Sequence, residues 1–338
     1  MRYRLLGRTG LRVSELFLGA MVFGTGSGMG APPEECRRML DLYAEAGGNV
    51  VDTANAYGQS EAILGELLEG RRDRFVLATK YGLTRDGRDP NAAGNHRKSL
   101  ALSLEASLRR LRTDYLDLYW VHLWDRHTPV EETMRALDDA VRAGKILYAG
   151  ISDAPAWVVA RANTLAEWRG WTPFAGLQVP YNLLRRDIER ELLPMAETLG
   201  MTVAAWGPLA GGILSGKYTR PGGAEAGTRV APGSLGERDH AAARATQEVA
   251  DQLGATPSQV AIAWTRARSR AVHPIIGARS AEQLADNLGA LDLDLPSDAV
   301  RRLEAAVPFE VGFPTDFIGE TSPEVFGAAF TGLDRGGR

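Results

Sequence analysis

The chain is poor in cysteine: one residue, Cys36, occurs in 338. A single cysteine cannot form an intramolecular disulfide, so the fold has to depend on a hydrophobic core, and the composition fits a reducing compartment. The N-terminus lacks a basic-then-apolar signal pattern, and no apolar run approaches the roughly 18 residues of a membrane span. We therefore expect a cytoplasmic protein with no membrane partner.

An excess of charge is also missing. The net charge is −3 and the pI is about 6.0, which argues against nucleic acid or an anionic membrane as a partner. Four of the histidines (His96, His127, His240, His273) show no metal-ligand spacing, so we expect no metal site. Acidic pairs such as Glu131-Glu132 stand at predicted helix starts, which disfavours a two-carboxylate hydrolase. No G-x-G-x-x-G motif opens a strand–helix turn, so a dinucleotide would have to bind in another way.

What the chain does have is a regular alternation of apolar strands with amphipathic helices. This pattern predicts an α/β fold with a parallel sheet, and 338 residues suit one (β/α)8 TIM barrel with insertions. We expect a single domain over 1–338: an N-terminal β-hairpin (1–14), the barrel (15–306) and a C-terminal loop (307–338). A long glycine-rich loop, from about 208 to 235, follows the seventh strand. The expected strands are 16–20, 49–52, 75–80, 116–122, 146–151, 175–179, 202–206 and 273–276, and the expected helices include 32–46, 60–69, 96–111, 130–143, 155–168 and 187–199.

Three successive strands end in ionisable residues, namely Asp52, Lys80 and His122, and the loop after the first of them adds Tyr57. In a parallel barrel these four side chains converge on one rim. A lysine ammonium near a tyrosine hydroxyl is expected to lower the tyrosine pKa, and an aspartate paired with the lysine keeps it charged. A histidine at the same rim can orient a carbonyl oxygen. The set is suited to carbonyl reduction, with Tyr57 as proton donor and hydride from a cofactor.

The order and spacing of several motifs resemble the aldo-keto reductase family over residues 1 to about 310. The motifs are Asp52-Thr53-Ala54-x-x-Tyr57-Gly58, Ala78-Thr79-Lys80-Tyr81-Gly82, Leu116-Asp117-Leu118-Tyr119-x-Val121-His122, Gly150-Ile151-Ser152, Leu177-Gln178-Val179-x-Tyr181-Asn182, Trp206-Gly207-Pro208-Leu209-x-Gly211-Gly212 and Ile276-Gly277-Ala278-Arg279. The loop-rich form of the chain resembles a bacterial branch similar to the potassium-channel β-subunit-like reductases. The resemblance implies catalytic roles for Asp52, Tyr57, Lys80 and His122.

The resemblance also implies an extended NADPH or NADP across the top of the barrel, with the loop after strand seven as a lid. The cofactor-binding residues are expected to be Gly19, Ala20, Met21, Asp52, Tyr57, Ser152, Asp153, Gln178, Trp206, Gly207, Pro208, Leu209, Gly211, Gly212, Ser215, Lys217, Ile276, Gly277, Ala278, Arg279, Gln283 and Asn287. Arg279, at the start of the last barrel helix, suits a phosphate dianion and favours NADP over NAD. Asp153 departs from the asparagine that many relatives carry, which leaves its contact with the carboxamide open.

The substrate is expected to be a small carbonyl compound held by Phe23, Tyr57, His122 and Trp124. The tail aromatics Phe309, Phe313, Phe317 and Phe326 either line the pocket or pin the tail to the barrel. Two other functions stay open: an NADP-bound redox sensor with slow turnover, and a reductase of a nucleotide-linked deoxysugar held by Arg85, Arg88, Arg126 and Arg185-Arg186. The sequence does not predict the oligomeric state.

Overall fold

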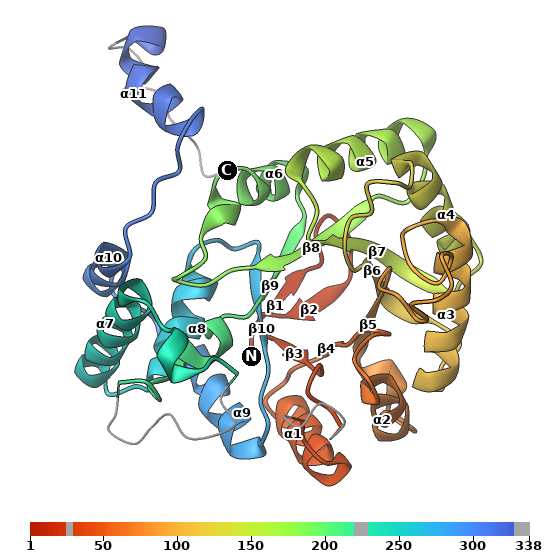
Figure 1. Cartoon of the computed structure of the whole chain (residues 1–338), viewed down its shortest axis with the longest axis horizontal. Helices are drawn as coiled ribbons and strands as arrows, with labels where there is room; N and C mark the ends of the chain where they lie inside the picture. Colours follow the sequence, from red (N-terminus) through yellow and green to blue (C-terminus); the bar gives the residue numbers. More distant parts are fainter. Residues whose placement is uncertain (25–29, 220–228, 328–338) are drawn as a thin grey trace.

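Eight parallel strands close into a barrel, so the predicted TIM-barrel fold is confirmed. The computed structural model describes residues 1–24, 30–219 and 229–327. Around the barrel the order is β10, β3, β4, β5, β6, β7, β8, β9, and every neighbouring pair is parallel (Figure 1). The strands are β3 Phe17–Gly19, β4 Val50–Asp52, β5 Val76–Tyr81, β6 Leu116–Val121, β7 Ile146–Ser152, β8 Phe174–Pro180, β9 Thr202–Trp206 and β10 Val272–Ile276.

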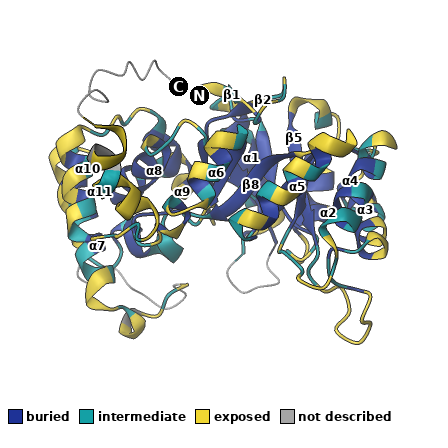
Figure 2. Cartoon of the chain, turned by 90° about the horizontal axis from the view of Figure 1, so that it is seen from above, coloured by how far each residue is buried: buried dark blue, intermediate teal, exposed yellow. Residues whose placement is uncertain are grey.

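The helices between the strands form the outer layer, and their apolar faces pack on the barrel while their outer faces meet solvent (Figure 2). They are α1 Pro33–Glu45, α2 Ser60–Leu67, α3 Arg97–Leu111, α4 Val130–Arg142, α5 Ala156–Arg169, α6 Leu192–Leu199, α7 Glu237–Leu253, α8 Pro257–Ala267, α9 Ala281–Leu288 and α10 Ser297–Ala306. The expected helix over 187–199 is instead a short 3₁₀ turn, Asp187–Glu189, followed by α6. Pro194 explains the break, because a proline lacks the N–H that a continuous helix needs and is tolerated only in a first turn.

The predicted N-terminal hairpin is present as β1 Tyr3–Leu5 and β2 Arg12–Ser14. Leu6 and Val13 of this segment belong to the same buried cluster as the inward-facing Trp120 of β6. A Cβ atom added at Gly150 would lie 2.3 Å from the Trp120 ring, so glycine is required there. The barrel interior is therefore a packed core, which leaves the carboxyl ends of the strands as the open end.

The tail differs from the expected loop because it contains a helix, α11 Thr315–Phe326, which stands apart from the barrel in Figure 1. The Asp316 carboxylate accepts a hydrogen bond from the Gly312 N–H at 2.7 Å, which favours a helix start at this point. Phe313 is 84% exposed, and Phe317 and Phe326 are also exposed. Phe309, in contrast, lies under the guanidinium of Arg190 at 4.6 Å. Phe309 therefore holds the start of the tail against the barrel, and none of the four aromatics lines the cleft described below.

No helix within the described ranges is long and apolar enough to cross a membrane. The cytoplasmic location and the domain boundaries stay predictions.

Candidate active site

The four residues at the strand ends come together as the sequence predicted they would. Lys80 of β5 is fully buried and forms an ion pair with Asp52 of β4, which is 4% exposed. The Lys80 ammonium also donates to the Thr53 carbonyl at 2.7 Å and lies 4.9 Å from the centre of the Tyr57 ring. His122, directly after β6, packs edge-on against Tyr57 with ring centres 5.7 Å apart. Asp52, Tyr57 and His122 line one end of a cleft, and Lys80 lies behind them.

The pKa of Tyr57 is shifted in the opposite direction to the one expected. Burial raises the pKa of Tyr57 above its usual value, and the opposing effect of Lys80 is smaller. Burial, with a smaller contribution from the Lys80 charge, lowers the pKa of His122 to about 3. Its Nδ1 is buried with no hydrogen-bond partner among the described residues. Near neutral pH both rings are therefore uncharged, and each can hydrogen-bond a carbonyl oxygen.

The opposite wall of this end is built by β7, β8 and β9. Gln178 of β8 donates to the second Asp52 oxygen at 3.0 Å, which holds the aspartate toward Lys80. Trp206, at the end of β9, donates from its indole Nε1 to Asp153 at 3.3 Å. Ser152, Asp153, Gln178 and Trp206 all line the cleft.

The cleft has a volume of about 1030 Å³ and runs from these strand ends to α9. The segment after β9 covers part of it, with a 3₁₀ turn at Ala210–Ser215. Gly211 and Gly212 have φ angles of 68° and 97°, which glycine adopts without strain. A Cβ at Gly212 would lie 2.5 Å from the Lys217 ammonium, so the end of that lysine side chain packs closely over this turn. The expected lid continues through residues 220–228, which lie outside the described residues.

Three cations gather at the α9 end of the cleft: Lys217, Arg229 and Arg279. Burial and the charges of Arg279 and Arg229 together lower the pKa of Lys217. Because like charges repel, such a cluster is suited to a polyanionic ligand such as a phosphate. The helix N-terminus beside it is capped by Ser280, and one of its amides, that of Ala281, already donates to the Glu35 carboxylate at 2.5 Å.

Most of the predicted ligand-binding residues line the cleft, with three exceptions. Ala20 is buried and donates its N–H to the Asp52 carbonyl at 2.8 Å. Phe23 is buried in a bridge to Ala31, and Trp124 packs edge-on against Trp157. The cleft is also lined by residues that the sequence analysis did not name as ligand-binding: Asn182, Leu184, Arg229, Val230, Arg238, Asp239, Ser258, Ile262 and Asp286. The motif at Tyr181-Asn182 was a signal for the first of these. Arg229 and Val230 lie within the long loop and the residues from 238 to 262 follow it, and neither group carries a strand-end signal.

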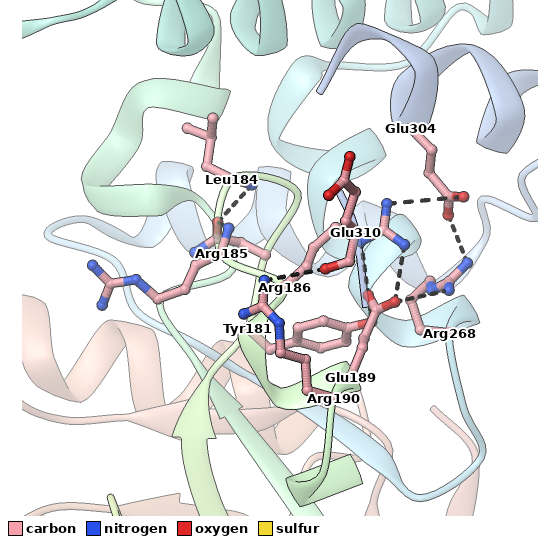
Figure 3. A network of polar contacts seen from close by, with 10 residues as sticks. Tyr181, Leu184, Arg185, Arg186, Glu189, Arg190, Arg268, Glu304 and Glu310 are labelled. Carbon is pink, nitrogen blue, oxygen red and sulfur yellow. Dashed lines mark hydrogen bonds and ion pairs between the residues drawn. The ribbon is translucent and has the colours of Figure 1, made fainter. Parts of the chain in front are cut away.

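A buried ion network supports the loop after β8 (Figure 3). Tyr181 donates to Glu189 at 2.7 Å, and Arg186 forms two hydrogen bonds with the same carboxylate at 2.8 and 2.9 Å. Arg268 links Glu189 to Glu304 of α10, at 3.4 and 2.6 Å. The guanidinium of Arg186 is therefore taken up by this network, and Arg186 does not line the cleft. Of the two arginines considered for binding a nucleotide-linked sugar in this loop, only Arg185 lines the cleft.

The same loop is tied to the strand beside it. The Asn182 amide donates to the Gly207 carbonyl at 2.9 Å and accepts from the N–H groups of Leu184 and Arg185, both at 2.9 Å. Asn182 therefore fixes the turn that presents Arg185 to the cleft.

Comparison with known proteins agrees with this site. Residues 15–308 match the model of the aldo/keto reductase family. The chain is 40% identical over 339 residues to a norsolorinic acid reductase of Aspergillus flavus, across 96% of this chain and 86% of that protein. It is 39% identical over 340 residues to a putative aryl-alcohol dehydrogenase of Saccharomyces cerevisiae, across 94% and 90% of the two chains. It is also 39% identical over 336 residues to an aldo-keto reductase of Aspergillus calidoustus, across 94% and 85%.

These relatives are fungal reductases and an aryl-alcohol dehydrogenase, so they do not support the predicted bacterial branch that resembles the potassium-channel β subunits. The resemblance to the family itself is confirmed by the match over residues 15–308. The chain belongs to the aldo/keto reductase family and is an oxidoreductase acting on CH–OH groups.

Proposed function

We propose that the protein is an NADP-dependent reductase of aryl aldehydes or ketones, with Tyr57 as proton donor. The observation that carries the proposal is one continuous cleft with the Asp52–Lys80–Tyr57–His122 cluster at one end and the Lys217–Arg229–Arg279 cluster at the other. NADP carries its nicotinamide ring at one end and its 2′-phosphate at the adenosine end, with the pyrophosphate between them, and the cleft offers a matching division. The residues present therefore fit NADP.

Each part of the cofactor has a matching set of residues in the cleft. Arg279 and Lys217 would hold phosphate groups, and Gly211 and Gly212 would allow the backbone to approach them closely. Ser152, Gln178 and Trp206 would hold the nicotinamide end, while Gln283 and Asn287 would reach the adenosine. When bound, NADPH would supply the hydride.

The cluster at the strand ends would transfer the proton to the substrate. A substrate carbonyl oxygen between Tyr57 and His122 would accept hydrogen bonds from both neutral rings. The Tyr57 hydroxyl would transfer its proton to that oxygen as the alcohol forms. The Lys80 ammonium, held by Asp52 and the Thr53 carbonyl, would stabilise the resulting phenolate.

An aromatic pair follows His122 in the chain, outside the cleft lining. Trp124, two residues after His122, meets Trp157 of α5 edge-on, with ring centres 5.8 Å apart. Trp157 is 60% exposed, and the neighbouring Leu123 is 48% exposed. The aryl substrate class is instead supported by the printed name of one relative, a putative aryl-alcohol dehydrogenase.

The direct test is NADPH oxidation at 340 nm with matched aryl and alkyl aldehydes, and with NADH in parallel. Turnover with the aryl series, weaker turnover with the alkyl series and a preference for NADPH would support the proposal. Tight NADPH binding with negligible turnover on the whole panel would contradict it and favour a redox-sensing role.

Replacing Arg279 with glutamine should weaken NADPH binding about 10- to 100-fold, because a charge-assisted phosphate contact is worth roughly 1.5–3 kcal/mol. NADH, which has no 2′-phosphate, should bind almost as before. Calorimetric titration with both cofactors measures the two constants. Arg301→Gln on α10, outside the cleft lining, is the matched control. An equal loss of affinity for NADPH and NADH would show that Arg279 does not bind the 2′-phosphate.

The rate of reduction should be nearly independent of pH between about 5 and 9. Burial raises the pKa of Tyr57 above its usual value near 10, so the proton-donating form persists throughout this range and is lost only at higher pH. The pKa of His122 is lowered to about 3, so its ring stays neutral over the same range. The check is kcat/KM for an aryl aldehyde at saturating NADPH in overlapping buffers. A fall with a midpoint between about pH 6 and 8 would assign proton transfer to another group.

A further inference from the structure

Asp153 occupies an unusual position in the backbone. It follows β7 directly, and its φ angle is 46°, in the left-handed region that few residues other than glycine, asparagine and aspartate adopt. Its N–H donates to the Gln178 carbonyl at 3.1 Å, which fixes the turn. The conformation directs the side chain into the cleft, where it accepts the Trp206 indole N–H at 3.3 Å. An isosteric asparagine would tolerate the same backbone.

Asp153 has no cationic partner in direct contact among the described residues, unlike Asp52 at the same end of the cleft. Lys80 is paired with Asp52, and the ring of His122 is neutral near pH 7. Asp153 forms no ion pair within 4.0 Å among the described residues, and its hydrogen bonds come from the neutral donors Trp206 and Ser152. The more distant charges of Lys80 and Arg185 act on it only through space. Burial raises the pKa of Asp153, and the hydrogen bonds from Trp206 and Ser152 oppose that effect. In its ionised form, Asp153 adds a negative charge to this end of the cleft.

Asp153 lines the same cleft as Tyr57, and its backbone N–H is hydrogen-bonded to Gln178, whose side chain donates to Asp52 of the catalytic cluster. Its charge makes a minor contribution to the raised pKa of Tyr57. Tyr57 donates its proton to the oxygen of the carbon that exchanges hydride, so the redox-active ring has to bind at the same end of the cleft. The two redox forms of the cofactor differ in charge only at that ring, which is cationic in NADP⁺ and neutral in NADPH.

We propose that the Asp153 carboxylate makes the site discriminate between the two redox forms of its nicotinamide cofactor, strengthening the binding of NADP⁺ relative to NADPH. This inference rests on the proposed function, because it requires a nicotinamide at the Tyr57 end of the cleft. Because a carboxylate attracts the cationic ring and not the neutral one, we expect it to change the affinity ratio by on the order of tenfold.

The discrimination has a consequence for the direction of the reaction. The balanced equilibrium is alcohol + NADP⁺ ⇌ carbonyl + NADPH + H⁺, in which two electrons move as hydride and the proton passes through Tyr57. By thermodynamic linkage, any factor that favours NADP⁺ over NADPH in the free enzyme shifts the equilibrium between the two bound forms toward bound NADP⁺, and therefore toward carbonyl reduction, by the same factor. Asp153 thus sets the equilibrium between the two enzyme-bound forms, while the overall equilibrium in solution is unchanged, and it takes no part in proton transfer.

The experiment is calorimetric titration of the wild type and of Asp153→Asn with NADP⁺, NADPH and adenosine 2′,5′-bisphosphate. In the variant, the ratio Kd(NADP⁺)/Kd(NADPH) should rise about tenfold. Affinity for the bisphosphate, which lacks the nicotinamide, should stay within about twofold. Asp153→Glu keeps the charge and should keep most of the wild-type ratio.

Each outcome has a definite meaning. An unchanged or lowered ratio in an Asp153→Asn protein that binds the bisphosphate normally would overturn the inference while leaving the proposed function intact. The same shift in Asp153→Glu as in Asp153→Asn would also overturn it, because shape rather than charge would then be the cause. Failure of the wild type to bind any of the three ligands would refute the proposed function and the inference with it.

Discussion

Replacing Tyr57 with phenylalanine should reduce kcat for carbonyl reduction by at least about 1000-fold, within the range that general acid catalysis contributes. The substitution removes only the hydroxyl, which would be the proton donor. The ring contacts with His122 and with the Lys80 ammonium can remain, because both involve the ring itself. NADPH affinity should therefore change little, and calorimetric titration should give a Kd within about threefold of the wild type.

The matched control is Tyr148→Phe on β7, which removes a hydroxyl elsewhere in the barrel and lies outside the cleft lining. Its kcat should stay close to the wild-type value. Single-turnover measurements with enzyme in excess separate the chemical step from product release. Turnover of Tyr57→Phe at more than about a tenth of the wild-type rate would show that another group, or water, delivers the proton.

The convergence of these residues was predictable because it depends on topology alone. Parallel strands bring their carboxyl ends to one rim, so Asp52, Lys80 and His122, at the ends of three successive strands, had to become neighbours once the barrel closed. The pairing of Lys80 with Asp52 follows from the same register. Asp52 lies opposite Ala78, and Lys80, two residues after Ala78, points to the same face of the sheet as Ala78. Strand topology therefore predicted the catalytic cluster, whereas the cofactor-binding residues were expected from the family resemblance.

The pKa of Tyr57 could not be predicted in the same way. The direction of the shift in its pKa depends on whether burial or the Lys80 charge has the larger effect. Sequence spacing indicates that Lys80 is near but does not indicate how far Tyr57 is buried. The contact between Asp153 and Trp206 was hidden for a related reason, because it joins two strand ends through a left-handed residue that no periodic pattern indicates. The contribution of Arg229 depends on the path of a long glycine-rich loop, which local sequence does not determine.

Replacing Lys80 with methionine should lower the free energy of unfolding by about 3–5 kcal/mol, in addition to reducing activity by about 100-fold or more. Lys80 is fully buried, and its loss leaves the Asp52 carboxylate without its cationic partner in a site where Asp52 is 4% exposed. Gln178 still donates to Asp52, but one neutral hydrogen bond does not offset an uncompensated buried charge. Urea unfolding followed by tryptophan fluorescence measures the loss of stability.

The double variant Lys80→Met with Asp52→Asn separates the two effects. Neutralising both partners removes the buried charge, so the double variant should be more stable than Lys80→Met alone by about 1–3 kcal/mol. The side-chain oxygen that remains after Asp52→Asn could still accept the Gln178 amide, which preserves that contact. Activity should not return, because the Tyr57 phenolate would still lack its cation. Recovery of both activity and stability would mean that the ion pair stabilises the fold and has no role in catalysis. Stability that stays at the level of Lys80→Met would mean that packing of the lysine stem, rather than charge pairing, is what the barrel rim requires.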